Sequence, residues 1–122
     1  YYITDLRGDI SLKMEINNLQ SNNGPLYIRI LDGNENPVIV GTSPVINYSA
    51  RISFDSISPG KYAIQFFHDE NENQKMDFSL IGIPKEKVGS SNNIKPILGP
   101  PKFEKMLFSL TENKKVIMKP VN

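Results

Sequence analysis

Hydrophobic and polar residues alternate strictly in the stretch Ile10-Ser11-Leu12-Lys13-Met14-Glu15-Ile16, and this stretch decides the fold class. Successive side chains of a β-strand point to opposite faces, so a period of two predicts a strand with one buried face. The same period returns near residues 26–31, 50–55, 62–68, 106–110 and 116–118, residues 38–40 form a short apolar run, and turn-forming residues separate most of these stretches. The sequence therefore predicts an all-β protein, an antiparallel β-sandwich of about seven strands of the immunoglobulin-like or transthyretin-like type.

Two connections in this pattern carry more specific predictions. Ser58-Pro59-Gly60 is a tight-turn sequence, and it predicts a hairpin between the strands near residues 50–55 and 62–68. The segment 102–110 fits a helix about as well as it fits a strand, and that alternative stays open. Residues 70–101 are rich in Asn, Gly, Pro, Ser and Lys and predict one long ordered loop.

Length and composition exclude several classes of protein. The chain has 122 residues, 14 Lys and Arg against 13 Asp and Glu, and no Cys. This length predicts a single domain over residues 1–122, with residues 1–8 as a frayed N-terminal segment. Without Cys there is no disulfide, thiolate zinc site or cysteine nucleophile. The charge is balanced and forms no basic stripe, so we expect no nucleic-acid partner, and no apolar run is long enough to predict a transmembrane segment.

The strongest chemical signal is the acidic loop that follows the stretch at residues 62–68. Counted from Asp69, oxygen-bearing side chains fall at positions 1, 3, 5 and 9, and a backbone carbonyl is available at position 7. Ca²⁺ prefers six to eight oxygen ligands, and this spacing resembles the way an EF-hand loop wraps one ion. With one further carboxylate from the next segment, the predicted ligands are Asp69, Asn71, Asn73, Lys75 (through its carbonyl), Asp77 and Glu86.

The match to a calcium loop is partial. Gln74 stands where the sharp turn of an EF-hand loop has Gly, and Leu80 stands where it has a bidentate Glu. We therefore expect weak binding, with a dissociation constant on the order of 0.1 to 1 mM. The alternative is an Asx-rich turn in which these side chains cap their own backbone and bind no ion.

Several motifs, in order along the chain, resemble an uncharacterised bacterial family. They are Ser58-Pro59-Gly60, Phe67-His68-Asp69, Gly82-Ile83-Pro84, Gly89 and Gly99-Pro100-Pro101. The family is known as domain of unknown function twenty-one forty-one, and the resemblance runs from about residue 9 to residue 119. It implies a β-sandwich exported from a bacterium, secreted or periplasmic, whose signal peptide has been removed. It implies no enzyme activity, because the family has none assigned.

Three other readings of the sequence compete with an ion-stabilised loop. His68, Asp69 and Ser90 or Ser91 contain the residue types of a hydrolytic triad, but neighbours on a strand point to opposite faces, and we expect His68 to bond to backbone instead. Carboxylates of the acidic loop could supply a glycosidase pair. The tyrosines Tyr1, Tyr2, Tyr27 and Tyr48 could form a platform that stacks on sugars.

These observations favour a non-enzymatic exported binding or structural module with a calcium-stabilised loop. A carbohydrate-binding module is the first alternative, and a hydrolase that uses the acidic loop is the second. The partner is expected to be a protein or a glycan, and the sequence does not specify the oligomeric state.

Overall fold

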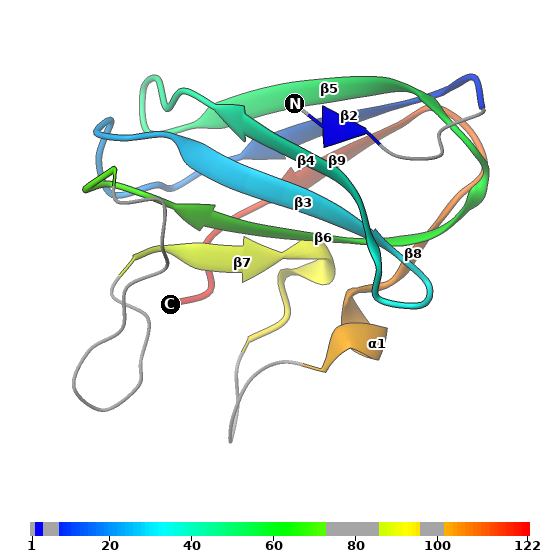
Figure 1. Ribbon diagram of the computed structural model, residues 1–122. Helices are drawn as coiled ribbons and strands as arrows, with labels where there is room; N and C mark the ends of the chain where they lie inside the picture. The colour runs from blue at the N-terminus through cyan, green and yellow to red at the C-terminus, as the bar shows by residue number, and fades with distance from the viewer. Residues whose placement is uncertain (1, 4–7, 73–85, 96–101) are drawn as a thin grey trace.

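The computed structural model describes residues 2–3, 8–72, 86–95 and 102–122 (Figure 1). Nine strands, one short α-helix and one 3-10 turn follow one another along these residues. In chain order they are β1 (Tyr2–Ile3), β2 (Ile10–Ile16), β3 (Leu26–Asp32), β4 (Pro37–Ser43), β5 (Ala50–Ile57), β6 (Gly60–His68), β7 (Val88–Ser90), η1 (Ser91–Asn93), α1 (Phe103–Met106), β8 (Phe108–Leu110) and β9 (Lys114–Met118).

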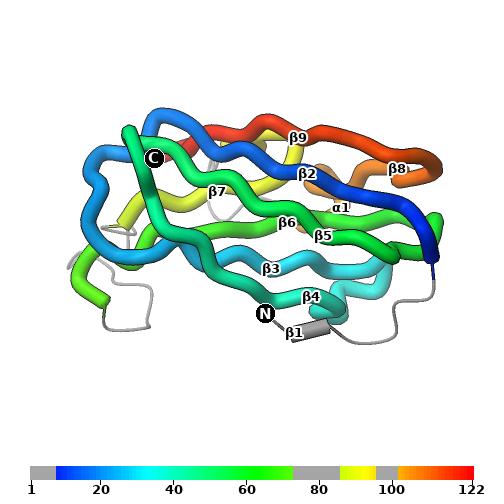
Figure 2. Tube along the Cα trace, turned by 90° about the horizontal axis from the view of Figure 1, so that it is seen from above, coloured from blue at the N-terminus to red at the C-terminus, as the bar shows by residue number. Residues whose placement is uncertain are grey.

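The strands form two sheets that pack face to face. The larger sheet has the order β1-β4-β3-β6-β7, with β8 also paired to β6, and the smaller sheet has the order β5-β2-β9. Figure 2 shows the two layers from above, with β3 and β4 on one side and β2, β5 and β9 on the other. The predicted all-β sandwich is confirmed.

One hydrophobic core lies between the sheets. In β2 the alternation becomes burial, because Leu12, Met14 and Ile16 are at most 2% exposed while Lys13 points to solvent. The opposite sheet contributes Ile28, among others, to the same cluster. Burying a side chain of this size contributes about 1.5–3 kcal/mol, so the period-two pattern supplies most of the stabilisation of the fold.

The connection at Ser58-Pro59-Gly60 differs from the prediction. β5 pairs with β2 and β6 pairs with β3, so the predicted hairpin between residues 50–55 and 62–68 is wrong, and the turn instead carries the chain from one sheet to the other. The Tyr62 hydroxyl donates a 2.7 Å hydrogen bond to the Ser58 carbonyl and ties this crossing together. Hairpin and crossing turns share the same residue types, so local sequence could not separate them.

Three further details refine the predicted sandwich. The pair β2–β9 is parallel, because β9 follows a long excursion through the larger sheet. The strands β1 and β7 were not expected, since two or three residues are too short to show a period. The ambiguous segment 102–110 contains both alternatives in succession, α1 and then β8. Within the segment predicted as one long loop, β7 and η1 occupy residues 88–93.

The outer edge of β6 is closed by a side chain as well as by strands. β8 covers Gly60 to Tyr62, and β7 covers Gln65 to Phe67. Between them the buried Ile64 N–H donates to Ser91 Oγ at 3.0 Å, and that hydroxyl donates to the Met106 carbonyl at 2.5 Å. Ser91 therefore fills the gap that two short strands leave in the hydrogen-bond ladder.

Candidate functional site

The residues predicted to hold a cation lie where β6 ends and β7 begins. Asp69 directly follows β6, Asn71 lies in the turn after it, and Glu86 lies two residues before β7. Asp69 is completely buried and Glu86 is 5% exposed, whereas Asn71 is exposed. The other three predicted ligands, Asn73, Lys75 and Asp77, lie outside the described residues.

The backbone of Asp69 is held against β3. Its N–H donates to the Pro25 carbonyl at 3.0 Å, and its own carbonyl accepts from the Glu72 N–H at 3.2 Å, which closes the first turn of the loop. Gly24 makes this approach possible, since it has a φ of +73° and a Cβ there would lie 2.0 Å from the Asp69 carbonyl oxygen. The first predicted ligand is therefore anchored by the fold itself.

The pairing of β6 with β7 brings the two ends of the loop close together. Phe67 pairs with Val88, and a 2.9 Å hydrogen bond from the N–H of residue 68 to the carbonyl of residue 87 extends the pairing by one position. Asp69 and Glu86 are the residues next to these positions, at the two ends of the loop.

The C-terminal residue holds the Glu86 side of the site. Asn122 Nδ2 donates to the Glu86 carbonyl at 2.8 Å, and its Oδ1 accepts from the Val88 N–H at 2.9 Å. Lys87 Nζ adds a 2.6 Å hydrogen bond to the Asn122 carbonyl. Figure 1 shows the C-terminus beside β7. The side chain of Asn122 thus takes the place of a backbone amide along the free edge of this strand.

The burial of Asp69 and Glu86 requires partners for both carboxyl groups. An isolated buried carboxylate costs several kcal/mol of desolvation. Both Asp69 and Glu86 have interaction partners in the structure. Among the described residues no group of three or more His, Asp or Glu side chains is close enough to hold a metal ion. The described residues alone therefore form no metal site, and the predicted ligands Asn73, Lys75 and Asp77 lie outside them.

Glu70 has a structural role at the same turn. Its carboxylate accepts hydrogen bonds from Gln20 Nε2 and from Ser21 Oγ, the latter at 2.8 Å. These bonds fasten the start of the loop to the segment before β3. Glu70 was not predicted as a ligand, and its contacts direct it away from that function.

The residues of the hypothetical triad do not come together. His68 is completely buried, its Nε2 lies 3.3 Å from the Gly24 carbonyl, and its Nδ1 has no hydrogen-bond partner among the described residues. The expected bond to backbone is thus present. Ser91 Oγ is engaged in the β6 ladder, and Ser90 Oγ donates to the Ser91 carbonyl at 3.2 Å. This arrangement provides no activated nucleophile.

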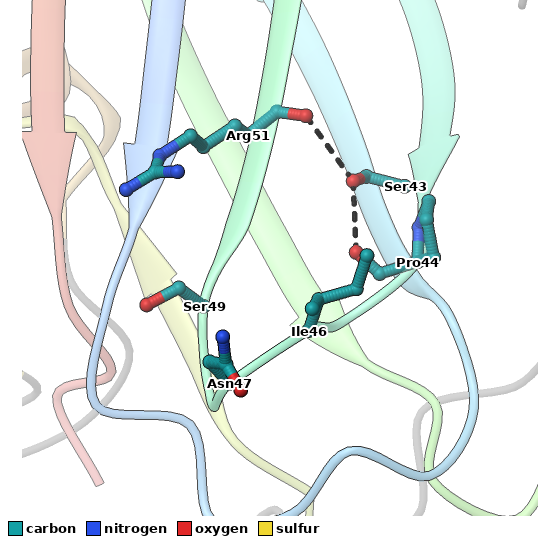
Figure 3. A pocket seen from close by; sticks show the side chains of 6 residues that line it. All are labelled: Ser43, Pro44, Ile46, Asn47, Ser49 and Arg51. Atoms are coloured by element: carbon teal, nitrogen blue, oxygen red, sulfur yellow. Dashed lines mark hydrogen bonds between the residues drawn. The ribbon is translucent and has the colours of Figure 1, made fainter.

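A hollow of about 470 Å³ lies at the turn between β4 and β5. Figure 3 shows its lining, Ser43, Pro44, Ile46, Asn47, Ser49 and Arg51. Ser43 Oγ lies 3.0 Å from the Pro44 carbonyl and 3.3 Å from the Arg51 carbonyl. The Arg51 guanidinium is paired with Glu15 at 2.9 Å. Ser43 and Arg51 thus each have a partner within the protein, and we place no candidate site in this hollow.

A second hollow, of about 310 Å³, lies on the larger sheet and was not predicted as a unit. Tyr27 and Phe67 line it with stacked rings, and Arg29 stands beside them. Sequence reasoning named Tyr27 as a sugar-stacking candidate but grouped it with Tyr48, which lies in the turn between β4 and β5. The signal it missed was that Tyr27 and Phe67 both occupy solvent-side positions of their alternating stretches.

Comparison with protein families gives a match to most of the chain. The model of the family described as "Uncharacterized protein conserved in bacteria (DUF2141)" matches residues 14–118. No curated protein and no solved structure matches the chain. Among the described residues no helix is long and apolar enough to cross a membrane.

Proposed function

The chain belongs to the uncharacterised bacterial family DUF2141, and from that premise we propose that it is a non-enzymatic β-sandwich binding module whose loop after β6 is ordered by Ca²⁺. The ion would be held by Asp69, Asn71, Asn73, the Lys75 carbonyl, Asp77 and Glu86. It would perform no reaction. Its effect would be to neutralise clustered carboxylates and to fix a polar loop that cannot pack by itself.

One observation carries this proposal: Asp69, directly after β6, and Glu86, two residues before β7, are both buried although each carries a carboxyl group. A divalent cation bound by both would balance their negative charge. Carboxylate and amide oxygens are the ligands that Ca²⁺ prefers, and the spacing after Asp69 supplies more of them. The anchoring of Asp69 on β3 and of Glu86 on Asn122 would keep part of the site formed before the ion arrives.

The expected affinity bears on where the protein works. Calcium sites of extracellular modules bind with dissociation constants of about 0.1–1 mM, far weaker than cytosolic sensors. A site of this strength is filled only where Ca²⁺ is abundant, outside the cytosol. We therefore place the protein in the secreted or periplasmic fraction, where an ordered loop would present its surface to a protein or glycan partner.

Calorimetric titration of the metal-free protein with CaCl₂ tests the proposal. We expect one site with a dissociation constant of about 0.1–1 mM. Removing one carboxylate ligand by Asp69→Asn or Glu86→Gln should weaken binding about tenfold or more, because each charge-assisted contact contributes about 1.5–3 kcal/mol. Glu72→Gln is the matched control, since it removes an exposed carboxylate of the same loop that is not a predicted ligand.

The control separates a site from a general attraction of cations to acidic residues. Glu72→Gln should leave the dissociation constant within about twofold, a change below 0.5 kcal/mol. Equal weakening in all three variants would indicate diffuse attraction and contradict a defined site. Absence of heat up to about 10 mM CaCl₂, well above the expected range, would leave the Asx-turn alternative.

A further inference from the structure

We propose that the outer face of the larger sheet carries a binding site for an acidic saccharide, formed by the hollow around Tyr27, Phe67 and Arg29. This inference needs only that the chain is a binding module, and it is independent of the calcium loop. It commits to one ligand chemistry, a sugar ring bearing a carboxylate, as in a uronic acid.

The strand register places the lining residues in two adjacent rows. Tyr27 lies opposite Phe67, and Arg29 lies between Val40 on β4 and Gln65 on β6. These positions alternate with the core residues of the same strands, so both rows point away from the core. Together they line the hollow of about 310 Å³. Val40 is 39% exposed and adds an apolar side chain to this face of the sheet.

The aromatic side chains that line the hollow, Tyr27 and Phe67, stack on one another. The two ring centroids are 5.1 Å apart and the ring planes differ by 7°. The centroid separation is close to the spacing between strands, about 4.7–4.9 Å, so the rings stand side by side with one face of each against the other. The second face of Tyr27 is thereby directed toward β4, where Thr42 lies opposite Tyr27. A pair that is already ordered loses little conformational entropy when a ligand stacks on it.

The charge of the residues that line the hollow indicates which kind of sugar would bind. Arg29 is exposed, and its Nε donates to Gln65 Oε1 at 2.7 Å, which fixes the guanidinium beside the rings. A guanidinium has five N–H donors, so this bond leaves others for a ligand. Among the described residues no carboxylate lines the hollow, so its charge is uncompensated there. The electrostatic complement of this hollow is an anion.

The distance between Tyr27 and Arg29 favours a sugar whose carboxylate is a substituent of the stacked ring itself. Tyr27 and Arg29 are two residues apart on one strand, about 7 Å along its axis. A six-membered sugar ring stacked on Tyr27 would place a carboxylate substituent within reach of the Arg29 side chain. Guanidinium groups bind carboxylates through two parallel hydrogen bonds, which fixes orientation as well as adding affinity. The helix α1 borders the hollow at Gln65, because Gln65 Nε2 donates to Met106 Sδ at 3.4 Å.

Amide NMR spectra recorded during titration with a galacturonic acid trisaccharide test the proposal. The titration is done in EDTA, so that a failed calcium site does not affect the result. We expect shifts at residues of the two rows, and about tenfold or greater weakening in Tyr27→Ala and in Arg29→Gln, the loss expected from a stacking contact or a charge-assisted contact. Tyr48→Ala and Lys13→Gln are the matched controls, being an exposed tyrosine and an exposed cation outside the hollow.

The neutral galactose trisaccharide separates the contributions of stacking and charge. The proposal predicts that it binds about tenfold or more weakly than the acidic one and that Arg29→Gln removes this difference. Equal affinity for both sugars would overturn the role of Arg29. Shifts confined to other surfaces, no shifts up to about 10 mM sugar, or equal losses in the control variants would overturn the site. Melting temperatures of the variants establish that each is folded.

Discussion

Replacement of Ser91 by Ala tests the account of how the larger sheet is closed. The hydroxyl accepts from the Ile64 N–H at 3.0 Å and donates to the Met106 carbonyl at 2.5 Å. Ile64 is completely buried and Ser91 is 1% exposed, so water cannot easily replace the lost group. Ser90→Ala is the neighbouring control, since Ser90 is equally buried but its Oγ bonds only to the adjacent carbonyl, at 3.2 Å.

The magnitude follows from the groups that lose a partner. An orphaned buried N–H costs about 1–3 kcal/mol, and the lost bond to the Met106 carbonyl adds about 0.5–1.5 kcal/mol. We therefore expect Ser91→Ala to lower the free energy of unfolding by about 2–4 kcal/mol. A chain of this length has an unfolding entropy of about 0.26 kcal/mol/K, so the melting temperature should fall by about 8–16 °C. Ser90→Ala should cost about 1 kcal/mol or less.

Urea unfolding at 25 °C measures both variants. A lower midpoint with an unchanged slope would show that stability, not the extent of unfolding, has changed. Hydrogen exchange adds a local readout, because the Ile64 amide should lose protection in Ser91→Ala and keep it in Ser90→Ala. Equal costs for the two variants, together with retained protection at Ile64, would refute the view that Ser91 completes the β6 ladder.

Two further predictions concern packing and charge. Gly89→Ala should destabilise the fold by about 1–3 kcal/mol in urea unfolding, because a Cβ there would lie 2.4 Å from the Phe66 ring. Gly33→Ala is the control, and it should change stability by less than about 1 kcal/mol because nothing lies within 4 Å of its Cβ position. Equal effects of the two substitutions would contradict this packing. The hydrogen bond from Arg51 holds the pKa of Glu15 below its ordinary value of 4.5, so its contribution to stability is present above pH 4.5 and is lost as the pH falls through the lowered pKa. The stability difference between the wild type and Glu15→Gln should therefore shrink on acidification below pH 4.5, and a difference that grows would contradict the assigned ion pair.

The fold class could be predicted because it rests on local patterns. The alternation through Leu12, Met14 and Ile16 is the burial pattern of β2, and similar stretches gave β3, β5 and β6. Pairing between strands that are distant in the sequence was harder to predict. The turn at Ser58-Pro59-Gly60 has the same residue types whether it closes a hairpin or joins two sheets, and the parallel pair β2–β9 depends on the path of the chain beyond residue 86.

The candidate sites, like the fold, could be predicted only as far as local sequence patterns reach. The acidic loop and the residues Asp69 and Glu86 were named from spacing and residue type, but their burial depends on how the two ends of the loop pack in the fold. The pairing of Tyr27 with Phe67 depends on the register of β3 against β6. The role of Asn122 as a substitute for a backbone amide depends on where the last residues lie against β7. None of these relations has a local signature in the sequence.

The most direct test of the calcium-ordered loop is the melting temperature in about 10 mM CaCl₂ compared with EDTA, with MgCl₂ as the control for ionic strength and valence. At a dissociation constant of 0.1 mM this excess of ligand stabilises the native state by about 2.7 kcal/mol, and at 1 mM by about 1.4 kcal/mol. The account predicts a calcium-selective rise of about 5–10 °C, reduced to less than about half in Asp69→Asn. Identical melts in all three solutions, or an equal rise in MgCl₂, would contradict it.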